Sequence, residues 1–407
     1  MGYKPIMSLL KAYFDQNSAR FETKMLLAVI FFDVLLLWFC ASYLSISYYE
    51  AKIYFNDSEI LSHIVKFSTF IFGQNDFGLR LPMVIFHVIS IVLLYNVSKF
   101  YLSCRIDRIF SVILFILLPG TIASAVVVND AGLCIMLTLL MLYLFHIKKI
   151  VVFYILLAAS VFIGNDFLAF YLALFIFALI KKDALMAWLC ASLFAFSIYF
   201  FGFDTNGKPS GHFVDTFGIF AAVFSPFVFF YFVYTLYRIW VKESKNLLWF
   251  VCVSAFCFCM IVSLRQRLNL EAFLPFCVIA TPLMIRMFMS AYRVRLPKFR
   301  KRYRAFGLFI FISLLLNYLV IVFNPIIYKF IDEPKNHFVY KLNIARELSK
   351  ALKSKDIYKI YTQDEKLVLR LKFYGIESGK ELRLTNGKEI VIKRFGKEIA
   401  GFKILKR

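Results

Sequence analysis

The 407-residue chain lacks several features that would place it in a common class of enzyme. It has no pair of histidines at the spacing of zinc ligands, no P-loop and no nucleophile elbow of the Gly-x-Ser-x-Gly kind. It also has no internal repeat and no low-complexity linker. The sequence therefore gives no support to intracellular nucleotide chemistry.

The positions of the cysteines do not indicate a disulfide framework. All eight cysteines lie in or beside hydrophobic stretches, and the segment after residue 327 contains none. Cys252, Cys257 and Cys259 crowd one predicted helix, where packing explains them better than metal binding. A cleavable signal peptide is not apparent either, because the first 24 residues are polar and amphipathic. We expect the first helix to direct its own insertion.

Charged residues are also few, at 18%, whereas 61% of residues are hydrophobic and the mean hydropathy is +0.74. A water-soluble chain of this length cannot bury so much apolar surface. Stretches long enough to cross a hydrocarbon core of about 30 Å predict an α-helical polytopic membrane protein with about eleven transmembrane helices. The predicted spans are Met25–Ile46, Met83–Lys99, Ile109–Val127, Ala131–His146, Val151–Ile163, Phe167–Ile180, Ala184–Phe201, Phe217–Tyr237, Leu247–Leu264, Ala272–Met289 and Phe306–Ile326. The polar triplet Gly164-Asn165-Asp166 predicts either two short helices that meet at a polar turn or one long tilted helix.

Lysine and arginine alternate between the loops that join these spans. The basic loops are Lys99 to Arg108, Lys148 and Lys149, Lys181 and Lys182, Arg238 to Lys245, and Arg293 to Arg304. The opposite loops are Asn129 and Asp130, Gly164 to Asp166, Phe203 to Thr216, and Arg265 to Glu271. Because basic loops stay on the cytoplasmic side, we expect a cytoplasmic amino terminus and a carboxyl-terminal tail on the outer side of the membrane.

The formal net charge of +23 does not indicate a nucleic-acid partner. Most of the excess lies in the cytoplasmic loops and in the tail, which all flank the bilayer. Basic residues at such places interact with anionic lipid headgroups, at about 1 kcal/mol each. Membrane lipids are therefore the expected partners, and a phosphate-bearing lipid substrate would be attracted by the same field.

Residues 327–407 predict a small soluble α/β domain on the outer side, following a transmembrane domain of residues 1–326. The predicted elements are a helix over Phe338–Leu352, a strand over Ile357–Tyr361, and a hairpin whose turn, Thr385–Lys388, joins Leu382–Leu384 to Ile390–Ile392. The domain boundary is expected near Asn324 to Lys335, where the last span ends.

The first outside loop, residues 47–82, holds acidic residues and an arginine at the membrane surface. Tyr49-Glu50-Ala51 follows the first span, and Phe72-Gly73-Gln74-Asn75-Asp76-Phe77-Gly78-Leu79-Arg80-Leu81-Pro82 leads into the second. The arrangement resembles the GT-C superfamily of lipid-phosphate-dependent glycosyltransferases, in the branch of the protein O-mannosyltransferases and the bacterial aminoarabinose transferase. Those enzymes place an acidic loop after their first helix and an aromatic-Gly-x-Asn-acidic-Phe-x-x-Arg-Leu-Pro run before their second. The tail step Phe373-Tyr374-Gly375 is similar to a step in many bacterial relatives.

The resemblance implies an integral membrane glycosyltransferase that moves a sugar from a polyprenyl-phosphate donor to a lipid, glycan or protein acceptor on the periplasmic side. Such a reaction needs a carboxylate to take the acceptor's proton and cations to hold the phosphate. Glu50 is the candidate base, although Tyr49 stands where relatives carry the first acid of a pair. Asp130, where relatives also carry an outward-facing Asp, is the second candidate catalytic carboxylate, or else an N-cap.

The remaining candidates are substrate-binding residues. Asp76 and Arg80 are four residues apart, so a helix would let them pair as a structural staple or contact substrate. Arg265 and Arg267 suit a lipid phosphate or interfacial anchoring. In the turn-rich loop between Asp204 and Asp215, Lys208 and His212 are candidates for sugar or phosphate contact.

The spacing requires no metal, although Glu50, Asp76 and Asp130 together offer oxygens to a divalent cation. Two other functions stay open: a transporter or flippase of lipid-linked saccharides, and a non-catalytic relative that binds polyprenyl phosphate. Transporters tend to carry polar or broken helices at the bilayer midplane, whereas the charges of this chain gather at the outer interface, which favours an enzyme.

Overall fold

A computed structural model describes residues 3–56, 60–202, 205–206, 211–268, 270–331, 333–337, 339–394 and 397–406. The chain divides into two units. The helical unit comprises Met1–Leu35, Val88–Thr121 and Cys134–Leu314, and the loop–tail unit comprises Leu36–His87, Ile122–Leu133 and Leu315–Arg407.

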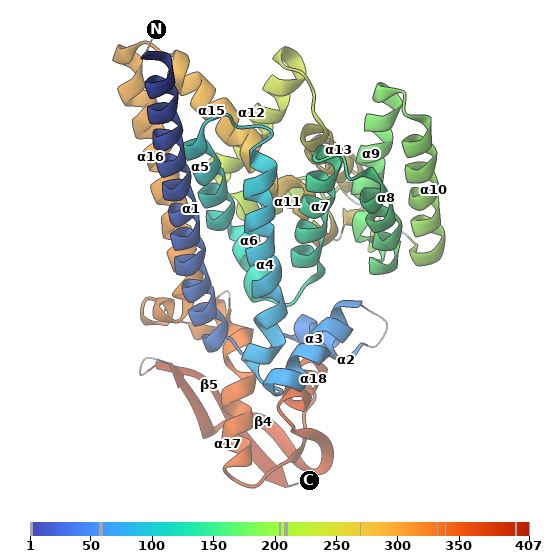
Figure 1. The fold of residues 1–407 in the computed structure, drawn as a ribbon. Helices are drawn as coiled ribbons and strands as arrows, with labels where there is room; N and C mark the ends of the chain where they lie inside the picture. The colour runs from blue at the N-terminus through green and yellow to red at the C-terminus, as the bar shows by residue number, and fades with distance from the viewer. Residues whose placement is uncertain are drawn as a thin grey trace. The chain divides into compact units, whose positions relative to one another are not determined.

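Helices make up most of the chain (Figure 1). The first ten α-helices are α1 (Tyr3–Tyr43), α2 (Tyr48–Phe55), α3 (Ile60–Phe72), α4 (Asp76–Ser98), α5 (Arg105–Leu117), α6 (Pro119–Val126), α7 (Asp130–His146), α8 (Ile150–Ala159), α9 (Leu168–Lys181) and α10 (Ala184–Phe201). The others are α11 (Phe213–Phe224), α12 (Pro226–Lys242), α13 (Leu247–Ser263), α14 (Leu274–Val278), α15 (Thr281–Val294), α16 (Pro297–Val322), α17 (Ala345–Lys353) and α18 (Glu365–Phe373). Short 3-10 turns are η1 (Ser160–Ile163), η2 (Asn165–Phe167), η3 (Leu270–Ala272), η4 (Asn324–Lys329), η5 (Pro334–Asn336) and η6 (Tyr340–Asn343).

Several helices are too apolar and too uncovered to face water. Within the described residues, five helices are long and apolar enough to cross a membrane, or up to seven if each of two bent pairs is one span. The apolar window of α16 has a mean hydropathy of 2.5, yet only 17% of it is buried inside the protein. Such a surface requires lipid around it. The chain is therefore a helical membrane protein, but the expected count of eleven spans is not confirmed.

Two of the predicted spans are bent pairs rather than single helices. The stretch Ile109–Val127 breaks between α5 and α6 by 65°, and Phe217–Tyr237 breaks between α11 and α12 by 104°. The second helix of each pair begins at a proline, Pro119 or Pro226. Proline lacks the N–H that continues a helix but fits its first turn, so it ends one helix and starts the next.

The polar triplet separates two short helices, as the first of the two interpretations predicts. Helix α8 and η1 end at Gly164, whose φ is +105°, and η2 leads from there into α9. Asn165 then donates its side-chain N–H to the Gly202 carbonyl oxygen at 2.6 Å. A backbone with positive φ at this turn favours glycine, since other residues meet steric strain there.

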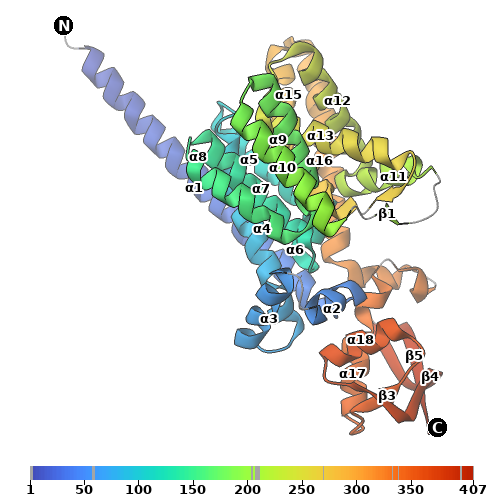
Figure 2. The same cartoon turned by 90° about the vertical axis from the view of Figure 1, so that its right-hand side faces the viewer.

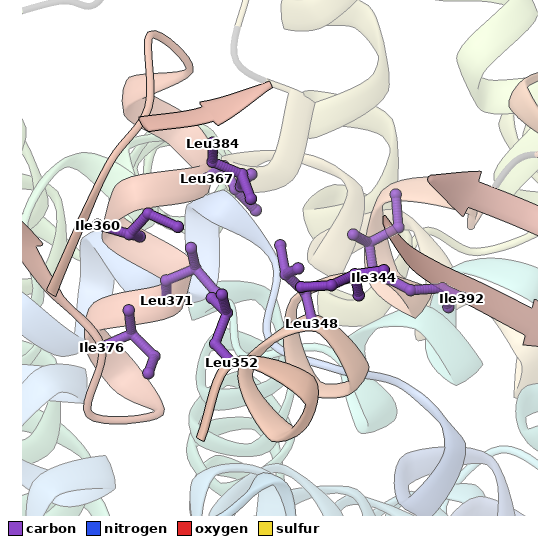
Figure 3. Close-up of a cluster of buried hydrophobic side chains, with 10 residues drawn as sticks. Ile344, Leu348, Leu352, Ile360, Leu367, Leu371, Ile376, Leu384 and Ile392 are labelled. Atoms are coloured by element: carbon purple, nitrogen blue, oxygen red, sulfur yellow. The ribbon is translucent and has the colours of Figure 1, made fainter. Parts of the chain in front are cut away.

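The tail is an α/β domain with its own core. Strands β3 (Lys359–Tyr361), β4 (Glu377–Arg394) and β5 (Lys397–Lys406) form a sheet in the order β3-β4-β5, with β3 parallel and β5 antiparallel to β4. Helices α17 and α18 lie beside the sheet (Figure 2). Buried side chains from the helices and strands meet between them, among them Leu348, Leu352, Leu371, Leu384 and Ile392 (Figure 3). The predicted α/β character of the tail is confirmed.

The predicted hairpin turn at Thr385–Lys388 is wrong. Strand β4 runs through it, with a shift of register between Asn386 and Ile390. Gly387 and Gly401 face each other so closely that a Cβ on Gly401 would lie 2.2 Å from the Gly387 carbonyl oxygen. Asn-Gly fits a tight turn, but glycine in a strand also permits a bulge where two backbones approach closely.

The Gly164 turn is tested by substitution of two glycines that both have open space for a Cβ. An alanine at Gly164 would be strained only because the backbone there has a positive φ. Gly218 lies inside α11, where the backbone is helical. We expect Gly164→Ala to destabilise the protein by about 1 kcal/mol and Gly218→Ala to stabilise it by up to about 1 kcal/mol. Thermal unfolding of both purified variants in detergent measures these shifts. Two shifts of the same sign would contradict the assignment.

Candidate functional site

The first outside loop is built by local capping. Ser47 accepts a hydrogen bond from the Glu50 backbone N–H at 3.0 Å, and the Glu50 carboxylate accepts one from the Ser47 N–H at 2.7 Å. This reciprocal arrangement is a capping box that starts α2. It turns the Glu50 side chain back toward the end of α1.

A second set of local contacts starts α4. Gly73 adopts a φ of +85°, and the side-chain oxygen of Asn75 then caps the helix by accepting from the Gly78 N–H at 2.8 Å. Because Pro82 has no N–H to donate to the Gly78 carbonyl, that oxygen would lack its helical partner. The Ser68 hydroxyl of α3 donates to it instead, at 2.6 Å. The Gly-x-Asn-x-x-Gly spacing thus fixes the start of α4 and the position of Arg80.

Arg80 is fully buried and uses all five of its N–H groups. Two go to the Glu50 carboxylate, from Nε and Nη2, each at 3.0 Å. Three go to backbone carbonyls that follow or end α1, namely those of Ala41, Leu44 and Ser45. The last carbonyls of a helix have no partner within it and attract cations. Arg80 therefore caps the end of α1 while it pairs with Glu50.

Glu50 is equally enclosed, with no exposed surface. Its Oε1 accepts from Arg80 and from the Val128 backbone N–H at 3.1 Å, and its Oε2 accepts from Arg80 and from Ser47. Four donors thus converge on one carboxylate. Both carboxylate oxygens therefore already have two protein partners each.

Asp76 has partners from the tail rather than from its own helix. The Tyr374 hydroxyl donates to its Oδ1 at 2.5 Å, and Nη1 of Arg346 lies 3.3 Å from its Oδ2. The predicted Asp76–Arg80 pair is therefore wrong, because the five N–H groups of Arg80 are taken by Glu50 and backbone carbonyls. Burial first, and then the charge of Asp76, raise the pKa of Tyr374 above its ordinary value. The tyrosine keeps its proton and remains a donor.

The same tail residues bind the loop through apolar and backbone contacts. Phe373 is buried in a cluster with Ala51, Leu79 and Val128, and its ring lies 5.1 Å from that of Tyr54, edge to face. The Tyr374 hydroxyl also accepts from the Ile46 N–H at 2.9 Å. Helices α2 and α18, more than 300 residues apart, lie side by side (Figures 1 and 2).

Asp130 is the first residue of α7, directly after the turn whose Val128 N–H binds Glu50. The N-cap is its neighbour, because the Asn129 side-chain oxygen accepts from the Gly132 N–H at 3.3 Å. Asp130 is partly exposed, unlike Glu50 and Asp76. The turn before α7 therefore lies close to the first loop, and Asp130 is not the cap.

The other predicted binding residues form a second group, in the helical unit. Strands β1 (Thr205–Asn206) and β2 (Arg267–Leu268) pair antiparallel, and the His212 N–H donates to the Ser263 carbonyl at 2.9 Å. The pairing joins the His212 loop to the segment of Arg265 and Arg267, whose side chains are both exposed. His212 also lies 3.5 Å from Asp215. Lys208 lies outside the described residues.

The buried carboxylates do not fit a cation in this arrangement. Among the described residues, no group of three or more His, Cys, Asp or Glu side chains could hold a metal ion. Glu50 and Asp76 accept hydrogen bonds from nitrogen and hydroxyl donors, which a cation would have to displace. We derive no step through a metal.

Arg346 was not predicted as part of this cluster. It lies in the first turn of α17 and donates to the Ser42 and Tyr43 carbonyls at 2.6 and 3.2 Å, in addition to Asp76. Its partners are some 270 to 304 residues earlier in the chain. No spacing rule links such positions, whereas the Phe373-Tyr374-Gly375 step did mark Tyr374.

The fold has a counterpart among solved protein structures. The chain matches the crystal structure of ArnT from Cupriavidus metallidurans bound to undecaprenyl phosphate, with a TM-score of 0.55 and 11% sequence identity, over 86% of this chain and 84% of that one. It matches the apo state of the same protein with a TM-score of 0.57 and 12% identity, over 89% and 85%. No family model and no curated protein sequence matches the chain. The resemblance to GT-C enzymes is thus confirmed at the level of the fold.

The buried ion pair is tested by removing one charge. Glu50→Gln leaves Arg80 buried without its counterion, and we expect a loss of stability of about 3 to 5 kcal/mol. Glu365→Gln, which changes an exposed carboxylate of α18, is the matched control and should shift stability by less than about 0.5 kcal/mol. Thermal unfolding in detergent compares the two. Equal melting temperatures would refute the structural role of Glu50.

The contact between tail and loop is tested at Tyr374. Tyr374→Phe removes the donor to Asp76 and the acceptor of the Ile46 N–H, so we expect a destabilisation of about 1 to 3 kcal/mol. The control is Tyr358→Phe, at a tyrosine whose side chain is 52% exposed. Limited proteolysis of the tail, followed by mass spectrometry, should show faster cleavage in Tyr374→Phe only. Identical cleavage rates in the two variants would count against the contact.

Proposed function

We propose that the protein is an integral membrane glycosyltransferase that moves a sugar from a polyprenyl-phosphate donor to an acceptor. The observation that carries the proposal is the fold, which most of the chain shares with a protein crystallised with undecaprenyl phosphate. The acidic first loop, which motivated the resemblance, supports it independently because it places carboxylates beside apolar helices.

The reaction joins an acceptor hydroxyl oxygen to the anomeric carbon of the sugar. The bond between that carbon and the phosphate oxygen breaks, the lipid phosphate leaves as an anion, and the hydroxyl proton passes to a carboxylate. Charge builds on the leaving phosphate as the bond lengthens, so cations near it lower the barrier. The chain must therefore supply one accessible base and at least one cation.

Asp130 is our choice for the base. It is partly exposed in the first turn of α7, where the positive end of the helix dipole favours a negative charge. Glu50, the other predicted catalytic carboxylate, has four donors and no exposed surface. We assign Glu50 to positioning, since it holds the Val128 N–H and so fixes the turn that carries Asp130.

The second group of residues, in the helical unit, is assigned by itself to binding a lipid phosphate. Arg265 and Arg267 present exposed guanidinium groups, which bind phosphate oxygens in a bidentate manner. His212 is bound to the same segment, because its N–H donates to the Ser263 carbonyl oxygen. We also assign Lys208 to the same phosphate, from its place in the turn-rich loop of the sequence. Arg80 and Asp76 then act through the loop rather than on substrate, because their polar atoms already bind protein.

The charge pattern of the loops supports a bacterial inner membrane location with a cytoplasmic amino terminus. In that orientation the acidic first loop, the Asp130 turn and the tail of residues 327–407 are periplasmic. We therefore propose transfer on the periplasmic side, to an acceptor that is a lipid, a glycan or a protein.

Donor consumption tests the proposal. The purified protein is incubated with a panel of radiolabelled polyprenyl-phosphate sugars and with membrane extract as acceptor, and sugar release is measured. We expect one donor to be consumed. Asp130→Asn should slow turnover by about 100-fold or more with an unchanged melting temperature, whereas Glu50→Gln should lose activity and stability together.

The control is again Glu365→Gln, which should keep wild-type turnover. Consumption that survives Asp130→Asn would remove Asp130 from the mechanism but leave the transferase reading intact. If no donor is consumed while polyprenyl phosphate still binds, the protein is a non-catalytic relative or a transporter of lipid-linked saccharides. In that case Tyr49, which is exposed at the position where relatives carry an acid, would be the residue to replace by an acid in order to restore activity.

A further inference from the structure

An apolar cavity of about 510 Å³ lies within the helical unit. None of its lining residues belongs to either group of candidate site residues. Helices α5, α12, α15 and α16 line it, and its walls include Leu114, Leu117, Val228, Met284, Phe288 and Phe311. The volume is within the range of about 300 to 1,000 Å³ that small-molecule sites occupy. A cavity with these walls suits a hydrocarbon chain.

One lining residue breaks the apolar pattern. Among the described residues around the cavity, Arg304 alone is charged. It belongs to the first turns of α16, where Lys298, Arg300, Lys301 and Arg302 are also basic. The sequence contains no Asp or Glu between Glu271 and Asp332. None of the ion pairs in the described part of the chain includes Arg304, so its charge has no acidic partner among the described side chains.

Close packing shapes the wall beside Arg304. The Phe288 ring stacks on the Tyr303 ring, with centroids 4.6 Å apart. The Arg295 guanidinium lies over the same Tyr303 ring, 4.1 Å from its centroid. A Cβ on Gly307 would come within 2.5 Å of Phe288. Helices α15 and α16 therefore approach closely at this point, and Phe288 has little room to turn into the cavity.

We propose that the cavity binds one acyl chain of an anionic phospholipid whose phosphate lies against Arg304. An apolar cavity with a single cation at its wall matches an amphiphile with one anionic head. The argument is charge complementarity: a guanidinium group without an acidic partner binds a phosphate through charge-assisted hydrogen bonds. The surrounding lysines and arginines strengthen attraction to any anionic membrane surface, but only Arg304 adjoins the cavity. This lipid is separate from the donor of the proposed reaction.

Native mass spectrometry of the purified, delipidated full chain tests the site. Palmitoyl-oleoyl phosphatidylglycerol and the matching phosphatidylcholine are added in turn. We expect the wild type to retain one phosphatidylglycerol with at least a tenfold preference over phosphatidylcholine. Arg304→Ala should abolish the preference, while Arg302→Ala, two residues away and outside the cavity lining, should keep it.

A second pair of variants tests the cavity itself. Leu114→Trp fills it and should lower retention of both lipids at least tenfold, whereas Ile312→Trp, on the exposed surface of α16, should not. Matching melting temperatures show that each variant is folded. Arg304→Lys keeps the positive charge and should therefore retain part of the preference for phosphatidylglycerol.

Three results would overturn the proposal. Equal losses in Arg302→Ala and Arg304→Ala would mean a diffuse basic surface. Displacement of phosphatidylglycerol by millimolar inorganic phosphate would mean a simple anion site. One-for-one displacement by undecaprenyl phosphate would mean that the cavity serves the donor lipid. None of these results depends on turnover, so the proposed transferase activity and the lipid site fail separately.

Discussion

The buried pair of Glu50 and Arg80 organises the start of the loop–tail unit. Through it, the end of α1, the start of α2, the first turns of α4 and the turn before α7 are bonded to one another. Burying two charges is expensive, and the cost is offset only when nearly every donor and acceptor has a partner. Here all five N–H groups of Arg80 and both oxygens of Glu50 do. This complete satisfaction makes the arrangement specific, because any shift of one segment leaves a charge unpaired.

The tail extends the same network. Arg346 binds two further carbonyls at the end of α1, those of Ser42 and Tyr43, and it shares Asp76 with Tyr374. Phe373 meanwhile completes an apolar cluster formed by the loop helices. The tail is therefore part of the scaffold that orients the acidic loop. In the proposed enzyme, a tail substitution would alter turnover without any contact to substrate.

A fold shared at 11 to 12% identity means that few side chains are needed to specify it. Apolar runs place the helices in lipid, prolines divide the bent pairs, and capping residues mark where α2 and α4 begin. Loops and cavity walls can carry different chemistry without a change of that fold. That is where the proposed Asp130 base and the Arg304 lipid site lie, and each is testable without the other.

The sequence by itself determined the solvent, the bounds of one helix and several local turns. Ala184–Phe201 is a helix with the bounds predicted for it, the polar triplet divides α8 from α9, and the motif from Gly73 to Pro82 shapes its own turn. These features depend on neighbouring residues and on apolar length. Only the tertiary structure decided that Arg80 binds Glu50, that Asp76 binds Tyr374 and that β4 runs through an Asn-Gly step. Such partners are 30 to 298 residues apart, or depend on a strand pairing that local propensity does not encode.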